Sequence, residues 1–268
     1  MIGAVSIDKD MNVPMIGLGT FDLKAEEILA GIQVGYRLLD TAWQYGNEAE
    51  VGKAVKESGV KREEIIITTK LWTDDIRKRR VREACEESLR AFRMDYVDLY
   101  LIHWPAEGFE YAWEIMTQLK EEGKIRAVGV SNFQEHHLKA LERVSATRPV
   151  LNQIECHPYF RNEGLIAYCR EYDIAAQAWC PLGGSYSQLV NDHRLRPLAE
   201  KHRKASAQIV LRWHLQKNVL IIPRTSNRQH LVSNQDIFDF WLDNHDMEVI
   251  DSMDTGRRIG ADPDSFDF

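Results

Sequence analysis

Short apolar runs alternate with longer amphipathic segments along the chain, and this alternation limits the possible folds more than any other feature. Each run is apolar on both faces at its centre, which is typical of a strand in a buried parallel sheet. The pattern predicts eight strands, at residues 15–20, 38–42, 65–71, 97–103, 127–132, 151–156, 174–180 and 219–225. Apolar residues at i, i+3 and i+4 between them predict helices at residues 25–34, 48–57, 81–92, 111–119, 138–144, 165–172, 195–202, 207–215 and 231–238.

Eight strands that alternate with helices predict an α/β fold, the (β/α)8 or TIM barrel, and we expect residues 1–268 to form a single domain. A doubly wound Rossmann sheet is the alternative. That fold binds dinucleotides through a GxGxxG sequence after its first strand. The stretch Gly17-Leu18-Gly19 lacks the third glycine at the required place, which favours the barrel.

The composition excludes several other classes of protein. The chain has 34 Lys and Arg against 41 Asp and Glu, a net charge of −7, which argues against a nucleic-acid binder. No apolar run approaches the roughly 18 residues of a membrane span, and the N-terminus lacks the basic and apolar blocks of a secretory signal. The four cysteines form no CxxC pair, so we expect reduced thiols in a cytoplasmic protein.

Polar side chains close several predicted strands, and in a barrel the active site forms at the carboxyl ends of the strands. The second strand ends in Asp40, with Tyr45 just beyond it in the loop. The third strand ends in Lys70, and the fourth ends in His103. Each residue alone has an ordinary explanation, as a helix cap, loop packing, a solvated lysine or a satisfied histidine. Together they converge on one mouth of the barrel, where burying Lys70 and Asp40 is costly unless the two pair.

Proton delivery to a carbonyl group is the chemistry that suits these four residues. A tyrosine, with a pKa of about 10, is a poor acid at neutral pH. We expect Lys70 to lower the pKa of Tyr45, and Asp40 to hold Lys70 charged and in place. His103, as a neutral donor, is expected to orient the carbonyl oxygen beside the tyrosine hydroxyl.

Five motifs in register resemble those of the aldo-keto reductases, and the likeness covers essentially the whole chain. The motifs are Asp40-Thr41-Ala42-Trp43-Gln44-Tyr45-Gly46-Asn47-Glu48, Thr68-Thr69-Lys70-Leu71-Trp72, Leu101-Ile102-His103-Trp104-Pro105, Gly129-Val130-Ser131-Asn132-Phe133 and Asn152-Gln153-Ile154-Glu155-Cys156-His157-Pro158. The chain looks closest to the short prokaryotic members of the 2,5-diketo-D-gluconate reductase group. The resemblance implies a monomeric enzyme that transfers a hydride from NAD(P)H to an aldehyde or ketone.

The resemblance also implies roles for individual residues. Tyr45 would be the general acid, Lys70 and Asp40 its tuning pair, and His103 the residue that orients the carbonyl. A nicotinamide cofactor would contact Gly19, Thr20, Ser131, Asn132, Gln153, Trp179, Leu182, Gly183, Arg224, Thr225, Ser226, His230, Ser233 and Asn234. Within this set the carboxamide would bind Ser131, Asn132 and Gln153, the ring would stack on Trp179, and the pyrophosphate would lie along Leu182 and Gly183.

The segment after the eighth strand bears on the choice of cofactor. Family members usually carry Lys-Ser there and an Arg six residues after that Lys, which together grip the 2′-phosphate of NADP(H). This chain has Arg224-Thr225 at the first pair and His230 in place of the second cation. A neutral histidine gives up a charge-assisted contact, so we expect NADPH to be preferred by a smaller margin than elsewhere in the family.

The substrate side of the mouth is expected to involve His103, Trp72, Trp104 and Gln44. The loop after the fourth strand is short and the chain ends soon after Phe266, so we expect an open pocket walled by tryptophans. We expect no metal, because His136 and His137 have no third ligand at a convincing spacing.

Two other functions remain open from the residues. A Schiff-base aldolase would use Lys70 as its nucleophile, although the Ser131-Asn132, Gln153 and Arg224-Thr225 set has no role in that chemistry. A non-catalytic, cofactor-binding regulatory subunit would use the same barrel, because a fold does not fix a function.

Overall fold

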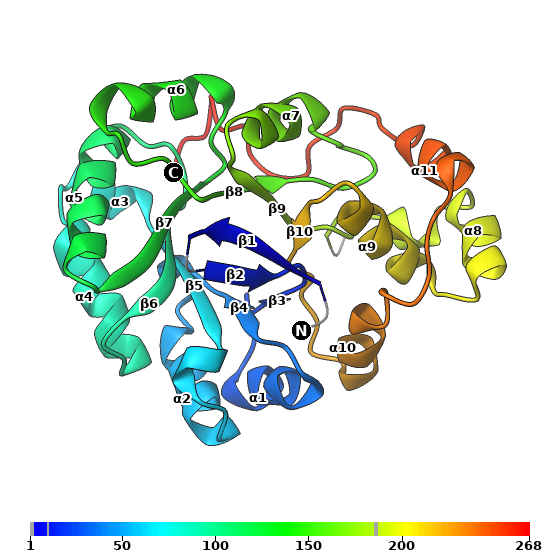
Figure 1. The fold of residues 1–268 in the computed structure, drawn as a ribbon, viewed down its shortest axis with the longest axis horizontal. Coiled ribbons are helices and arrows are strands. Elements are labelled where there is room, and N and C mark those ends of the chain that lie inside the picture. Colours follow the sequence, from blue (N-terminus) through cyan, green and yellow to red (C-terminus); the bar gives the residue numbers. More distant parts are fainter. Residues whose placement is uncertain (1–2, 10, 185–186) are drawn as a thin grey trace.

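The computed structural model describes residues 3–9, 11–184 and 187–268, and its strands and helices form the barrel that the alternation predicts. Eight strands pair in the order β10-β9-β8-β7-β6-β5-β4-β3, each parallel to its neighbour (Figure 1). Their bounds are β3 (Leu18–Gly19), β4 (Leu38–Asp40), β5 (Ile66–Leu71), β6 (Val97–Ile102), β7 (Ile125–Ser131), β8 (Leu151–Glu155), β9 (Ala175–Trp179) and β10 (Leu220–Ile221). The (β/α)8 prediction is confirmed.

The barrel closes between its first and last strands. Ile16, directly before β3, forms a parallel bridge with Ile221 of β10. The N–H of Gly17 donates to the carbonyl of Ile221 at 2.8 Å, and the N–H of Ile221 donates to the carbonyl of Met15 at 2.9 Å. These bonds satisfy backbone groups that an open sheet edge would leave unpaired, so the sheet has no exposed edge there.

Helices surround the strands, as Figure 1 shows, and each of the nine predicted helices has a counterpart. They are α1 (Ala25–Val34), α2 (Glu48–Ser58), α4 (Val81–Phe92), α5 (Phe109–Glu121), α6 (Glu135–Val144), α7 (Glu163–Glu171), α8 (Leu195–His202), α9 (Ser206–Gln216) and α10 (Arg228–Gln235). The segment predicted at 231–238 begins earlier as α10, because the Asn227 side chain caps it by accepting from the N–H of Gln229 at 2.8 Å. Two helices were not predicted, α3 (Thr73–Arg77) and α11 (Asn244–Asp251), and neither were the short 3-10 turns η1 (Trp43–Tyr45), η2 (Arg62–Glu64) and η3 (Leu189–Asn191).

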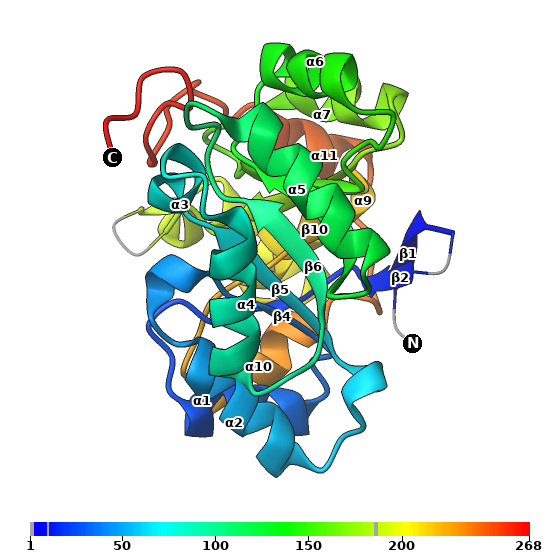
Figure 2. The same ribbon diagram turned by 90° about the vertical axis from the view of Figure 1, so that its left-hand side faces the viewer.

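An antiparallel hairpin that the sequence analysis missed covers one end of the barrel. It consists of β1 (Ala4–Asp8) and β2 (Met11–Pro14). Val13 of the hairpin is fully buried and belongs to the apolar cluster inside the barrel. In Figure 2 the hairpin lies at one end, while α3 and the C-terminal segment lie at the other. The hairpin closes the amino ends of the strands, which leaves the carboxyl ends for a site.

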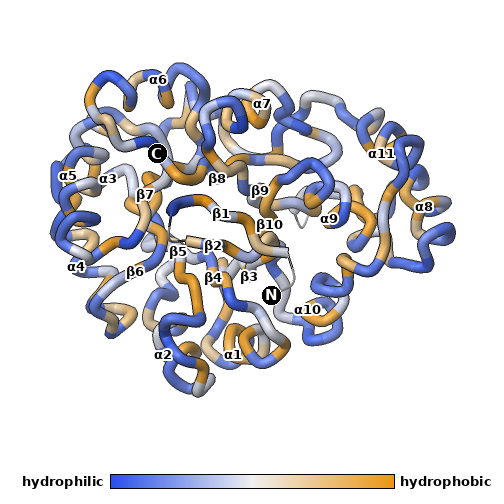
Figure 3. The backbone as a smooth tube through the Cα atoms, viewed as in Figure 1, coloured by the Kyte–Doolittle hydropathy of each residue, from blue (hydrophilic) through white to orange (hydrophobic). Residues whose placement is uncertain are grey.

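The hydrophobic core has two layers, one inside the barrel and one between the strands and the helices. In β6, Leu99 and Leu101 point into the barrel, whereas Tyr100 and Ile102 pack toward the helices. Figure 3 shows the result, with mostly hydrophobic strands inside helices of mixed character. Among the described residues, no helix has the length and apolar character needed to cross a membrane.

Candidate active site

A fully buried ion pair lies at the centre of the candidate site. Lys70 Nζ is 2.6 Å from Asp40 Oδ1, and it also donates to the carbonyl of Thr41 at 2.8 Å. The other oxygen of the Asp40 carboxylate, Oδ2, accepts from Gln153 Nε2 at 2.6 Å, and that amide also donates to Gln177 Oε1 at 2.7 Å. Strands β4, β5, β8 and β9 thereby meet through one hydrogen-bonded network inside the barrel.

The electrostatics of the pair keep Lys70 charged. Burial lowers the pKa of Lys70, but the attraction of Asp40 and Tyr45 outweighs it, so the net pKa lies above its usual value. Burial raises the pKa of Asp40, and Lys70 opposes that rise. A Schiff base requires a neutral amine. A lysine held as an ammonium between a carboxylate and a carbonyl is poorly suited to attack a carbonyl carbon, which argues against the aldolase.

Tyr45 lies beside this pair in η1. The Lys70 Nζ atom is 5.1 Å from the centroid of the Tyr45 ring, and the His103 ring lies edge-on to that ring with centroids 5.9 Å apart. The loop is fixed by Asn47, whose Nδ2 donates to the carbonyl of Thr20 at 2.6 Å and whose Oδ1 accepts from Thr41 Oγ1 at 2.7 Å. Tyr45 therefore has a defined position at the carboxyl end of β4.

The expected lowering of the Tyr45 pKa is wrong as a net effect. Burial raises the pKa of Tyr45, and the nearby charge of Lys70 opposes this rise without reversing it. The charge of Lys70 can be read from the sequence, whereas the desolvation of the phenol depends on the tertiary fold. The contribution of Lys70 has the expected direction, and the phenol is protonated at neutral pH.

His103 is buried and neutral. Burial, with a smaller effect from the Lys70 charge, lowers the pKa of His103 well below its usual value. Its Nδ1 atom has no hydrogen-bond partner among the described residues. The backbone is held by Asn132, whose Nδ2 donates to the carbonyl of His103 at 3.0 Å, and Trp72 packs edge-on to the ring at 5.2 Å. A neutral imidazole in this place can donate a hydrogen bond to an incoming oxygen.

The residues that the resemblance gives to the nicotinamide lie next to this group. Trp179 Nε1 donates to Asn132 Oδ1 at 2.8 Å, and Ser131 Oγ donates to the carbonyl of Gln153 at 3.0 Å. Asn132 has a positive φ of 62°, a conformation that asparagine tolerates better than most residues. The structure therefore brings Ser131, Asn132, Gln153 and Trp179 together, with the Gln153 amide already bound to Asp40.

The segment that follows β10 is mostly exposed. Arg224, Ser226 and His230 are exposed, and Thr225 and Ser233 are half-buried. Asn234 is buried, and the Tyr36 hydroxyl donates to the carbonyl of Leu231 in the same helix at 3.3 Å. Arg224 Nε donates to the carbonyl of Phe21 at 2.9 Å. Gly19 and Thr20 lie beside this segment, whereas Leu182 and Gly183 follow β9.

The mouth of the barrel is more covered than the sequence analysis expected. Phe268 stacks on Trp72 with ring centroids 5.5 Å apart and an interplanar angle of 6°. Phe266 and Phe268 both pack on Trp104, at 5.2 Å and 5.1 Å, which leaves Trp104 buried. The end of the C-terminal segment thus covers Trp72 and Trp104, which were expected to wall an open pocket. This contact joins parts of the chain that are far apart in the sequence. Gln44 is exposed in η1.

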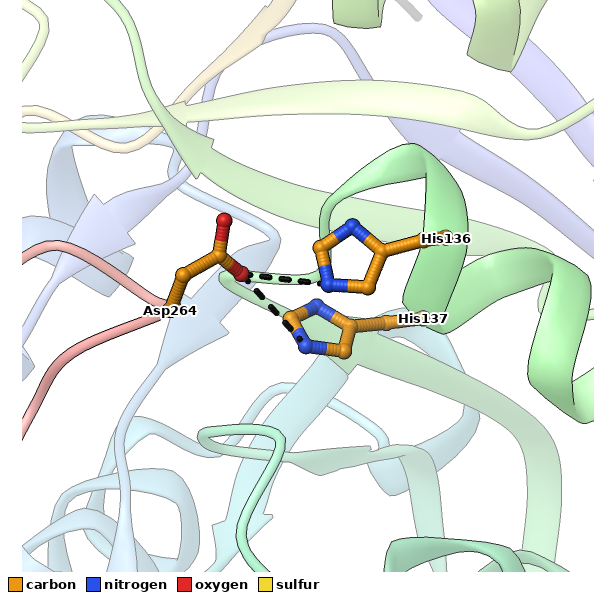
Figure 4. Close-up of side chains that lie close together, drawn as sticks. All are labelled: His136, His137 and Asp264. Atoms are coloured by element: carbon orange, nitrogen blue, oxygen red, sulfur yellow. Dashed lines mark ion pairs between the residues drawn. The ribbon is translucent and has the colours of Figure 1, made fainter.

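The two adjacent histidines of α6 have a third neighbour, contrary to the sequence analysis. Figure 4 shows Asp264 of the C-terminal segment facing both rings; its Oδ1 is 3.2 Å from His136 Nε2 and 3.6 Å from His137 Nε2. Burial lowers the pKa of His137 to about 4, so its ring is neutral at pH 7. Because His137 Nδ1 accepts from the N–H of Gln134 at 3.1 Å, the proton of the neutral ring lies on Nε2. His137 Nε2, the atom that faces Asp264, therefore carries a proton and has no free lone pair with which to bind a metal ion.

Several residues that support the site were not found from the sequence. Gln177 and Asn47 orient members of the network, and Phe21 packs edge-on to the Tyr45 ring at 5.0 Å. Glu155 Oε1 and Oε2 accept from the backbone N–H groups of Ile259 and Gly260 at 2.6 Å and 3.1 Å, which holds the C-terminal segment near Trp179. Glu155 was visible in a motif, but its partners depend on the tertiary fold.

Comparisons with known proteins show the family and the fold that this chain shares. The model of the Aldo/keto reductase family matches residues 19–255. The methylglyoxal reductase DkgA of Escherichia coli (strain K12) is 42% identical over 266 residues, 96% of each chain. The glyoxal reductase of Bacillus subtilis (strain 168) is 42% identical over 270 residues, 98% of this chain and 97% of that protein. The crystal structure of a Bombyx mori aldo-keto reductase in complex with NADP superposes with a TM-score of 0.90 at 32% identity, over 98% of this chain and 96% of that one.

Proposed function

The chain belongs to the aldo/keto reductase family, and we propose that it reduces its substrate with NADPH in preference to NADH and with Tyr45 as the general acid. Its family and its bacterial relatives make it an NAD(P)H-dependent oxidoreductase that reduces the carbonyl group of small aldehydes or ketones. The observation that carries the catalytic proposal is the position of Tyr45 between a buried ammonium and a neutral imidazole.

The residues present fit a nicotinamide cofactor. A Cβ atom on Gly19 would lie 2.9 Å from the carbonyl oxygen of Ile222, so only glycine allows this close approach of the two strands. Gly183 has a positive φ of 78° in the loop after β9. Arg224 is an exposed cation, with 41% of its side chain accessible, just before the N-terminus of α10, where phosphate groups bind favourably.

The cofactor, when bound, supplies a hydride to the carbonyl carbon. We assign the proton to the Tyr45 hydroxyl, which donates it to the carbonyl oxygen as negative charge develops there. Lys70 stabilises the phenolate that results, because its ammonium is held 2.6 Å from Asp40 and cannot move away. His103 donates a hydrogen bond to the same oxygen and fixes its position relative to Tyr45.

The substrates proposed are small α-oxo aldehydes such as methylglyoxal and glyoxal. This proposal rests on the named activities of the two bacterial relatives. The aromatic cover formed by Phe266 and Phe268 over Trp104 supports a small substrate, since it occupies space at the mouth. A panel of aldehydes, ketones and keto sugars, followed by NADPH absorbance, tests it. Higher kcat/KM for keto sugars than for methylglyoxal would contradict this assignment.

The preference for NADPH is proposed from Arg224, with a reduced margin because His230 replaces a second cation. The test measures kcat/KM with NADPH and NADH. Arg224→Gly should shift the preference toward NADH. His230→Arg should increase the preference for NADPH, since a charged guanidinium binds a phosphate more strongly than a neutral imidazole. Arg203→Gly is the matched control: this exposed arginine ends α8 at a positive φ that glycine accepts. A wild-type preference for NADH that Arg224→Gly leaves unchanged would refute the proposal.

We also propose that the chain works as a monomeric single domain in the cytoplasm. The ring of strands closes on itself within one chain, which supports a single domain. Each of the four cysteines is a free thiol, which supports a reducing compartment. Sedimentation equilibrium tests the monomer, and a dimer at micromolar concentration would contradict it.

A further inference from the structure

Arg224 is already bound to the loop that follows β3. Its Nε donates to the carbonyl of Phe21 at 2.9 Å, and its Nη2 donates to the carbonyl and to the Oδ2 of Asp22, at 3.3 Å and 3.4 Å. Among the described residues, no hydrogen bond engages Nη1. The loop therefore orients the guanidinium through two carbonyl groups and places a carboxylate next to it.

The loop is held firmly, so this carboxylate has a defined position. The N–H of Thr20 donates to the carbonyl of Asp40 at 2.9 Å, and the N–H of Leu23 closes a turn onto the carbonyl of Thr20 at 2.9 Å. Leu23 is buried, which anchors the end of the turn. Asp22 itself has a positive φ of 57°, and its side chain is 75% exposed, beside the guanidinium.

The carboxylate of Asp22 and the 2′-phosphate of NADP(H) are both anions that bind a guanidinium. A phosphate that approaches Arg224 either displaces Asp22 or meets its negative charge at close range. NAD(H) has no charge at this position, so its binding does not depend on Asp22. The carbonyl groups of the loop would still orient the arginine if the carboxylate were neutral.

We propose that Asp22 is a specificity-determining residue that lowers the affinity for NADP(H) by competing with its 2′-phosphate for Arg224. This inference rests on the proposed function, in which Arg224 binds that phosphate. The narrow preference for NADPH would then have two causes. One is the neutral His230 in place of a cation, and the other is the anionic Asp22 on the loop after β3. The expected effect is modest, about two- to five-fold, because exposed ion pairs contribute little in water.

The test measures binding of NADP⁺ and NAD⁺ to the wild type and to Asp22→Asn by quenching of tryptophan fluorescence. Asparagine suits the positive φ of this position, so the substitution removes charge without straining the turn. The variant should bind NADP⁺ about two- to five-fold more tightly and NAD⁺ with unchanged affinity. The gain should shrink at high salt, since exposed charges are screened.

Glu26→Gln is the matched control, because it removes the same charge from an exposed residue of nearby α1. It should leave both affinities unchanged. Unchanged or weaker NADP⁺ binding in Asp22→Asn overturns the proposal, and so does an equal gain for NAD⁺ or for the control.

Arg224→Gly separates this inference from the proposed function. If that variant binds NADP⁺ as tightly as the wild type does, the assignment of Arg224 to the phosphate is wrong. If it binds NADP⁺ weakly, the assignment stands, and adding Asp22→Asn to it should have little further effect. A full two- to five-fold gain in the double variant would contradict competition through Arg224.

Discussion

Replacing Asp40 with asparagine removes the only carboxylate among the described residues that pairs with Lys70. The Lys70 ammonium is fully buried, so without Asp40 it keeps the carbonyl of Thr41 as its acceptor but has no opposite charge. The asparagine amide would also face two donors, Lys70 Nζ and Gln153 Nε2, and its own NH₂ group can satisfy neither. Breaking a buried pair in this way costs about 3–5 kcal/mol.

We therefore expect Asp40→Asn to lower the free energy of unfolding by about 3–5 kcal/mol at pH 7, measured by urea-induced unfolding. The double variant with Lys70→Met leaves no unpaired charge, so its loss should be smaller than the sum of the two single losses. The stability difference between Asp40→Asn and the wild type should also depend on pH. In Asp40→Asn the pKa of Lys70 should fall below its unfolded value, so the variant should regain stability relative to the wild type as pH rises toward 10. A loss below about 1 kcal/mol, or losses that add in the double variant, would refute the role of the ion pair.

Gly19→Ala should destabilise the protein by about 1–3 kcal/mol and weaken cofactor binding, because its Cβ would lie 2.9 Å from a backbone carbonyl oxygen. Gly164→Ala is its control, since a Cβ there meets nothing within 4 Å, and equal effects in the two variants would contradict the argument. Asp192→Asn should lower the melting temperature at pH 7, because hydrogen bonds from Arg194 and Tyr159 hold the pKa of Asp192 well below its usual value. A carboxyl group with a lowered pKa stabilises the fold above its unfolded pKa of about 4. The difference from the wild type should therefore begin to shrink as the pH falls below about 4 and vanish only below the lowered pKa of folded Asp192. A difference that stays constant with pH would show that the charge is not responsible.

The sequence predicted those parts of the fold whose signal is local. The strand β6 was predicted because its residues other than Asp98 form an apolar run, and α4 because its apolar residues recur on one face. Asp40, Lys70 and His103 could be grouped because strands of a barrel end at the same mouth. Their catalytic roles remain predictions.

Contacts between distant segments could not be predicted from local patterns. The β1–β2 hairpin has few residues and weak alternation, and its burial depends on the open end of the barrel that it covers. Asp264 reaches His136 and His137 only because the C-terminal segment crosses the mouth. The upward shift in the pKa of Tyr45 needed a measure of burial, which the spacing of charges in a sequence does not provide.

The central claim is that Tyr45 delivers the proton, and the turnover of Tyr45→Phe tests it most directly. The substitution keeps the ring that packs against Phe21 and His103 and removes only the hydroxyl group. We predict that kcat for methylglyoxal reduction with NADPH falls by at least about 10²-fold, while the affinity for NADP⁺, measured by fluorescence titration, stays within about two-fold of the wild type. A variant that binds NADP⁺ normally and turns over at a near-wild-type rate would contradict the account.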